Sequence, residues 1–110
     1  MADEPSKEVL EKIFEAIEVA KATGKIKKGA NEVTKSVEKG EAKLAVTAKD
    51  VNPPEVIMHI PLLAEEKGVK HYSVPSKEEL GVSAGLGVQT TAVAIVKEGD
   101  AKKIIDEITK

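Results

Sequence analysis

The sequence predicts an α/β fold, a three-layer α-β-α sandwich in which helices cover both faces of a central sheet. Segments with helical and strand patterns alternate strictly along the chain, which begins and ends with a helix. The chain is 41% hydrophobic, which is enough for a modest aliphatic core. No internal repeat or linker interrupts the 110 residues, so we expect one domain over 1–110. Taken alone, strict alternation favours a mostly parallel sheet.

Three longer helices are predicted from apolar residues at helical spacing and from the residues at the helix ends. The first lies between Ser6, a favourable N-cap, and Gly24, which suits a helix end. The second runs from about residue 31 to 39. The third runs from about residue 53 to 67, and Pro61 predicts a kink or a restart within it.

The last two helices are expected to be shorter. The fourth opens with a capping box, in which Ser76 caps the helix and Glu79 follows three residues later. Asp100 is expected to cap the fifth helix. The apolar face of this fifth helix consists of Ala101, Ile104, Ile105 and Ile108.

Four short strands are expected at residues 25–28, 43–48, 70–74 and 92–96. The second and the fourth are nearly continuous apolar runs, as in strands that are buried on both faces. We therefore expect these two strands to be buried.

The loop GLGVQTT, residues 85–91, carries two apolar residues, Leu86 and Val88, between glycines and polar residues. Exposed apolar side chains on such a loop are costly unless they meet something. Two interpretations stay open: the side chains fold back onto the core, or they pack against an unstacked nucleobase.

The composition excludes several kinds of protein. Cysteine is absent, which excludes disulfides, thiolate metal sites and cysteine nucleophiles. The first residues, MADEPSKE, lack the basic start and apolar run of a secretory signal. No stretch approaches the roughly 20 apolar residues of a membrane span. We therefore expect a cytoplasmic protein without membrane contact.

The charge is unevenly distributed, although the formal net charge is only −2. Residues 21–43 hold seven lysines and three glutamates, a local charge of +4, so the rest of the chain carries −6. Such a basic segment can bind phosphate, or it can be a solvated lysine-rich surface. All 17 basic residues are lysine, which lacks the planar fork of arginine.

The sequence offers little for an enzyme. His59 and His71 have no evident partners, so we expect structural or surface roles for both. Asp50 follows a buried strand, yet KDVNPP also explains it as a turn residue. A hydrolase or transferase acting through Asp50 would need a nucleophile and a base that we do not find. The glycines at 81–87 do not follow a strand as in phosphate loops, and we expect no metal or cofactor.

A candidate recognition cluster lies in KKGANEVTKSVEKG, residues 27–40. The start of a helix attracts phosphate, and Gly29 lets an RNA backbone approach closely. Glu32 can accept hydrogen bonds from base N–H groups, Lys35 can donate to guanine, and Asn31 can do both. Regular A-form RNA hides these base edges, so the target must be bent. Alternatively, the three residues are merely a helix cap, a dipole partner and a surface lysine.

Four stretches together resemble a known family: KKGANEVTKSVEKG, DVNPPEVIMHIPLLAEEKG, VPSKEELG and GLGVQTTAVAIV. They resemble the archaeal kink-turn-binding large-subunit ribosomal proteins of the L-seven-Ae family, in order and over nearly the whole chain. The resemblance implies an α-β-α sandwich with a mixed, four-stranded sheet. It also implies binding to kink-turn RNA, a bent element with tandem sheared G·A pairs. Its implied partners are ribosomal RNA, box C/D and H/ACA guide RNAs with their assembly proteins, and ribonuclease P.

The resemblance also implies which residues contact RNA. Asn31, Glu32 and Lys35 match the residues that read the guanines of the G·A pairs. The surrounding contacts to the RNA backbone match Lys28, Gly29 and Lys39. Lys39 stands where arginine is common, so this position keeps its charge but loses the fork geometry.

A second group of matched positions surrounds extruded nucleotides. The residues that match the family's pocket for an extruded nucleotide are Asn52, Val56 and Lys77. The loop that packs over flipped bases matches Leu86, Gly87 and Val88, and Thr91 lies at its far end. Three positions depart from the family: Gly87 replaces a common Glu, Gln89 a frequent Pro, and Asn52 a usual acid.

The leading hypothesis is a non-enzymatic RNA-binding protein that is monomeric when free. The alternative is a protein–protein adaptor without RNA specificity, whose acidic, amphipathic first and last helices would be the contact surfaces. Binding to a kink-turn duplex, compared with the same duplex carrying Watson–Crick pairs, would separate the two.

Overall fold

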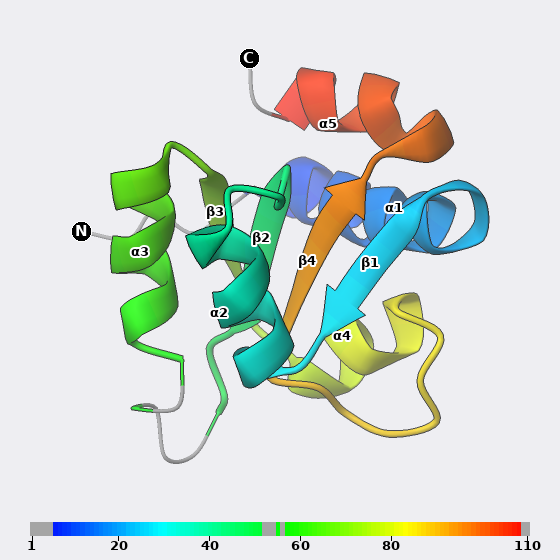
Figure 1. Cartoon of the computed structure of the whole chain (residues 1–110). Coiled ribbons are helices and arrows are strands. Elements are labelled where there is room, and N and C mark those ends of the chain that lie inside the picture. Colours follow the sequence, from blue (N-terminus) through cyan, green and yellow to red (C-terminus); the bar gives the residue numbers. More distant parts are fainter. Residues whose placement is uncertain (1–5, 52–54, 56, 109–110) are drawn as a thin grey trace.

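A four-stranded sheet lies between two layers of helices in the computed structural model, which describes residues 6–51, 55 and 57–108 (Figure 1). The predicted α-β-α sandwich is therefore confirmed. The elements are α1 (Lys7–Thr23), β1 (Lys25–Lys28), α2 (Ala30–Glu38), β2 (Leu44–Ala48), α3 (His59–Lys67), β3 (Lys70–Val74), α4 (Lys77–Ser83), β4 (Ala92–Lys97), the 3₁₀ turn η2 (Gly99–Ala101) and α5 (Lys102–Ile108).

The sheet is mixed, with the strand order β1-β4-β2-β3. Strands β2 and β3 are parallel, whereas β4 is antiparallel to both of its neighbours, β1 and β2. The mostly parallel sheet that alternation favoured is thus wrong, and the mixed sheet implied by the resemblance is confirmed. Alternation succeeds for β1, β2 and β3, which all run the same way. It fails at β4 because the short α4 and its following loop return the chain to the same end of the sheet (Figure 1).

The two faces of the sheet carry side chains of different size. Leu44, Val46 and Ile95 point to the face covered by α1, α4 and α5, and they join the larger core. Ala45 and Ala94 point to the other face, where they pack with residues of α2 and α3. Successive residues of a strand alternate between faces, so each central strand serves both cores. Alanine on the second face lets α2 lie close to the sheet.

The helix boundaries confirm most of the predicted caps. The side-chain oxygen of Ser6 accepts a hydrogen bond from the backbone N–H of Val9 at 3.3 Å. Ser76 likewise accepts from the N–H of Glu79 at 3.2 Å, as its capping box predicts. Since each cap satisfies an N–H group that has no partner within the helix, α1 and α4 begin where the sequence indicates.

Two predicted helix starts are wrong. Helix α3 begins at His59, later than expected, and Pro61 lies in its first turn, where no N–H donor is needed. Asp100 does not cap α5, because it lies inside η2, and its backbone N–H donates to the Thr23 hydroxyl at 2.9 Å. Of the expected apolar face of α5, Ala101, Ile105 and Ile108 are buried and Ile104 is partly buried against the core.

Each histidine lies within hydrogen-bond distance of a threonine from another element, a partner that the sequence did not indicate. His59 Nε2 lies 2.7 Å from the hydroxyl oxygen of Thr34, and His71 Nε2 lies 2.9 Å from that of Thr47. Burial lowers the pKa of His71 from 6.5 to about 4. No helix among the described residues is long and apolar enough to cross a bilayer.

The depressed pKa of His71 makes an acid-stability prediction. Between pH 6.5 and 4 the unfolded chain binds a proton at His71 that the folded chain does not, so the free energy of unfolding falls as the pH falls through this window. The full effect is roughly 3 kcal/mol, from about 1.4 kcal/mol for each pH unit. His71→Gln removes the proton site and should lose less stability than the wild type between pH 6.5 and 4 in urea unfolding. Equal losses in the two proteins would contradict this role.

Candidate nucleic-acid interface

Most of the predicted contact residues that the structure describes lie at one end of the sheet. The carboxyl ends of β1, β2 and β3 lie there together with the amino end of β4. Figure 1 shows the start of α2, the start of α4 and the loop before β4 along this lower edge. Segments that are far apart in the sequence therefore form one surface, and we call it the lower edge.

The start of α2 depends on Gly29. This residue occupies the N-cap with φ 91°, a backbone conformation that side chains disfavour, and it provides no side-chain cap. The N–H of Gly29 donates to the carbonyl oxygen of Ala92 at 2.8 Å, which ties the start of α2 to the start of β4. Asn31 and Glu32 are then the second and third helical residues. The alternative that Asn31 is merely a cap is therefore wrong.

The three candidate base-reading residues share an exposed face of α2. Asn31, Glu32 and Lys35 are all exposed, and spacings of three and four residues place Lys35 next to both of the others. Val33 and Val37 are fully buried on the opposite face and hold the helix on the sheet. The Glu32 carboxylate has one loose ion pair, at 3.9 Å from Lys27 Nζ, and its side chain is 54% exposed. Its oxygens thus remain accessible to a ligand.

The loop at residues 85–91 is fixed at both ends against α4. The N–H of Leu86 donates to the carbonyl of Gly81 at 2.9 Å, and the N–H of Thr90 donates to the carbonyl of Lys77 at 3.2 Å. Leu86 packs against the core, whereas Val88 is 71% exposed. The two interpretations of this loop therefore divide between its residues: Leu86 folds back, and Val88 remains available.

Asp50 has a structural role. Its Oδ1 accepts a hydrogen bond from the backbone N–H of Lys77 at 2.9 Å, so it links the end of β2 to the start of α4. Thr91 is half-buried, and its carbonyl accepts from the N–H of Ala48 at 3.0 Å. Lys77 is thereby held beside the loop that ends at Thr91. Asn52 and Val56, which were assigned to the same pocket, lie outside the described residues.

Further predicted contacts lie near this edge or lead away from it. Lys28 is exposed at the end of β1, immediately before Gly29. Gly87 is exposed next to Val88 in the loop. Lys39 is exposed at the other end of α2, so it extends the candidate interface along the helix.

Sequence reasoning missed the residues that position this surface. Gly81 lies within α4, where a β-carbon would meet the carbonyl oxygen of Val88, so its small size lets the loop lie against the helix. Thr90 is buried and donates its hydroxyl to the carbonyl of Ala92 at 3.2 Å. For Gly81, the available signal in the sequence was a glycine within an otherwise helical segment. For Thr90, a threonine in a polar loop, the sequence gave no signal.

A comparison with known families decides the affiliation. The model of the ribosomal protein L7Ae/L30e/S12e/Gadd45 family matches residues 11–105. The chain belongs to this family. The resemblance stated from its sequence motifs is confirmed at the level of the family.

A solved structure of similar fold agrees with this membership. The structure titled Giardia lamblia 15.5kD RNA binding protein has a TM-score of 0.90 to this L7Ae-type chain and 31% sequence identity. The similarity covers 96% of this chain and 88% of the other. The α/β fold with its four-stranded mixed sheet is therefore the fold of an L7Ae-type protein.

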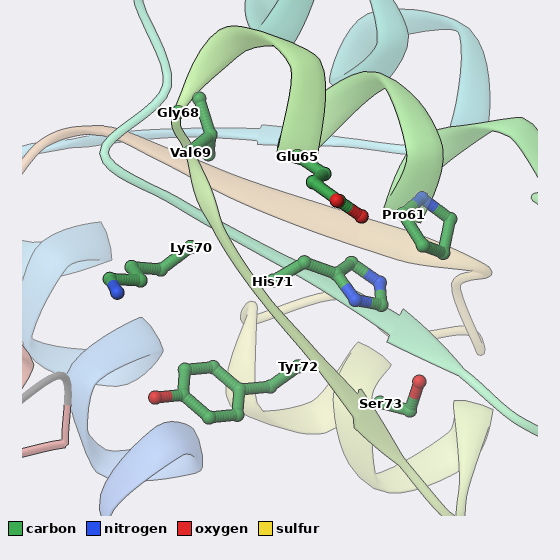
Figure 2. A pocket seen from close by; sticks show the side chains of 8 residues that line it. All are labelled: Pro61, Glu65, Gly68, Val69, Lys70, His71, Tyr72 and Ser73. Atoms are coloured by element: carbon green, nitrogen blue, oxygen red, sulfur yellow. The ribbon is translucent and has the colours of Figure 1, made fainter. Parts of the chain in front are cut away.

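The L7Ae-type fold also has a hollow away from the lower edge. It measures about 450 Å³ and lies between α3 and β3, where Figure 2 shows His71 near Pro61 and Glu65. The His71 imidazole contacts Thr47, and its pKa of about 4 makes it a weak base near neutrality. The lining also holds the Glu65 carboxylate, and no cluster of three or more His, Cys, Asp or Glu side chains that could hold a metal ion occurs in the described part of the chain.

Two glycines of the lower edge make a matched stability prediction. A β-carbon at Gly81 would meet the carbonyl of Val88, whereas one at Gly87 would meet nothing within 4 Å. Gly81→Ala should lower the free energy of unfolding by roughly 1–3 kcal/mol through overpacking. It should also speed amide exchange at Leu86 and Thr90, whose N–H groups fix the loop. Gly87→Ala, the control, should change stability by less than about 0.5 kcal/mol, and a larger loss there than at Gly81 would refute this account of the loop.

Proposed function

We propose that this L7Ae-type protein binds kink-turn RNA, recognises its tandem sheared G·A pairs and stabilises the bent form. The observation that carries the proposal is the exposed face of α2, where Asn31, Glu32 and Lys35 lie together and outside the core. Family membership and the RNA-binding protein of similar structure both support RNA binding.

Each member of the cluster supplies a different hydrogen-bonding capacity. The Glu32 carboxylate accepts from guanine N–H groups, the Lys35 ammonium donates to guanine O6 and N7 or to phosphate, and the Asn31 amide does both. The positive end of the α2 dipole adds attraction for phosphate, and the exposed Lys28 lies beside it. A carboxylate among phosphates would be repelled unless it accepted from a base, so Glu32 specifies bases rather than backbone.

The loop before β4 supplies an apolar contact. Val88 is exposed, whereas Leu86 packs against the core two residues earlier. The Val88 side chain is therefore held at the surface by a loop that is fixed to the core. An unstacked base that packed on Val88 would remove apolar surface of both the base and the valine side chain from water. Lys77, with Asn52 and Val56, would border the pocket for an extruded nucleotide.

Binding acts by population shift. A protein with contacts only to the bent state pulls the RNA towards that state by its difference in affinity for the two forms. The bent RNA then provides a platform for assembly proteins. The particles that we propose are the large ribosomal subunit, the archaeal box C/D and H/ACA guide particles and ribonuclease P, with the chain acting as a single, monomeric RNA-binding domain without cofactor.

A second candidate function, protein docking, is favoured by one groove. This groove between α1 and α4 measures about 360 Å³, with Phe14 and the 72% exposed Val82 among three glutamates. The last helix does not contribute as the adaptor hypothesis expected, because Ile105 and Ile108 of α5 are buried in the core. A basic, amphipathic segment of a partner protein would suit such a groove.

A gel shift separates the two functions. The probes are a kink-turn duplex and the same duplex with its G·A pairs replaced by Watson–Crick pairs. RNA recognition through base edges requires strong preference for the first duplex. Equal binding to both would overturn kink-turn recognition and leave the docking function.

Substitutions on α2 test the role of Glu32. Glu32→Ala should weaken binding to the kink-turn duplex by about 10- to 100-fold, since a bidentate base contact is worth roughly 1–3 kcal/mol. Glu38→Ala on the same helix removes an exposed carboxylate far from the helix start and should leave affinity unchanged or slightly improved. Lys21→Ala should weaken binding only slightly. Fluorescence anisotropy titrations check all three, and equal losses for Glu32→Ala and Lys21→Ala would contradict the assignment.

A further inference from the structure

A second basic feature lies along the free edge of the sheet, outside the guanine-reading cluster. It is a groove of about 380 Å³ beside β1 and the end of α2. Its lining consists of Lys25, Lys27, Lys39, Lys43 and Lys97, together with Glu41 and Val96. Five ammonium groups thus accompany a single carboxylate, and we call this feature the lysine groove.

The fold brings these lysines together at an energetic cost. Lys25 pairs with Lys97 across β1 and β4, next to an irregularity in the antiparallel register, and like charges on paired residues are destabilising. Lys43 is held at the same end because its N–H donates to the carbonyl of Ile95 at 2.6 Å. Within the described residues only Lys27 of this group has an ion pair, the loose one to Glu32. Packing alone does not require such repulsion, whereas a bound polyanion would relieve it.

Helix α2 connects the lysine groove with the lower edge. Its nine residues span about 13 Å at a rise of roughly 1.5 Å each. Glu32 and Lys35 lie towards the start of the helix, and Lys39 at its end lines the groove. A nucleic-acid strand that passes the start of α2 and continues along the helix would therefore enter the groove with its backbone.

We propose that the lysine groove is a second phosphate-binding site, which holds the backbone of one stem of the RNA bound at the lower edge. This inference rests on the proposed function, and it adds contacts that carry no base information. A run of phosphates suits the groove better than a single anion, because its charges come from two strands, a helix end and a loop. The groove would set the orientation of the stem relative to the protein.

The first experiment compares two double variants with equal changes of charge. Lys25→Gln/Lys97→Gln removes the opposed pair, and Lys67→Gln/Lys70→Gln removes two exposed lysines beside the other edge strand, β3. Affinity for a kink-turn duplex with two long stems is measured by anisotropy between roughly 50 and 200 mM KCl, the range over which counterion release is pronounced. The first variant should reduce the slope of log K against log salt by about 1–2, at roughly 0.7–0.9 for each lost phosphate contact. Equal slopes for the two variants would overturn the proposal.

The second experiment shortens each RNA stem in turn to a few base pairs. Trimming the stem that occupies the groove should reduce the wild-type slope by at least as much as the double substitution, because the stem also meets Lys27, Lys39 and Lys43. The same trimming should change the slope of Lys25→Gln/Lys97→Gln by less than it changes the wild-type slope. If trimming either stem leaves the wild-type slope unchanged, the groove does not hold a stem and the inference is wrong.

Two further readouts keep the outcomes distinct. Thermal unfolding of Lys25→Gln/Lys97→Gln without RNA should show equal or higher stability, because a repulsive pair is removed; a large loss would overturn the account of that pair. The preference for G·A over Watson–Crick duplexes should persist in this variant. If the wild type shows no preference for the G·A duplex, the proposed function is refuted. If it shows the preference but Lys25→Gln/Lys97→Gln has the same salt slope as the wild type, only the proposal for the lysine groove is refuted.

Discussion

The geometry of this protein depends on the insertion of one reversed strand between two others. Strand β4 lies between β1 and β2 and runs opposite to both. The carbonyl oxygen of its first residue, Ala92, accepts a hydrogen bond from the N–H of Gly29, the N-cap of α2. The loop that feeds β4 therefore ends beside the helix that carries the exposed polar face. If β4 lay at the far edge of the sheet, beside β3, Ala92 would not reach Gly29 and these two segments would have no shared boundary.

A chain of hydrogen bonds extends this arrangement across the same end of the sheet. Asp50 accepts from the N–H of Lys77, the carbonyl of Lys77 accepts from Thr90, and the carbonyl of Thr91 accepts from Ala48. Each bond joins two segments that are distant in sequence. The side chains that protrude from this end, including Val88, are thus presented by backbone that is fixed at several points, and this favours recognition of a rigid, shaped partner.

The sequence was sufficient for most elements but not for their relative direction. Ser6 and Ser76 begin their helices as predicted, because a cap depends on residues within one turn. The direction of β4 was not predictable from alternation. It depends on whether α4 and the loop after it carry the chain to the opposite end of the sheet before β4 begins. The start of α2 was misjudged by one residue, because the cap is a glycine whose carbonyl and φ value, rather than a side chain, define the helix end. The candidate contacts came mainly from the resemblance, whereas Gly81 and Thr90 act through tertiary contacts that no local pattern reveals.

The alanine-lined face of the sheet has a consequence for how this surface can vary. Helix α2 packs against β4, whose Ala92 and Ala94 face the same core as the helix and have side chains that end at the β-carbon. Apart from glycine, replacements at these positions can only add volume. The distance between the helix and the sheet is therefore near its lower limit. Substitutions at these positions can increase this distance but can hardly decrease it.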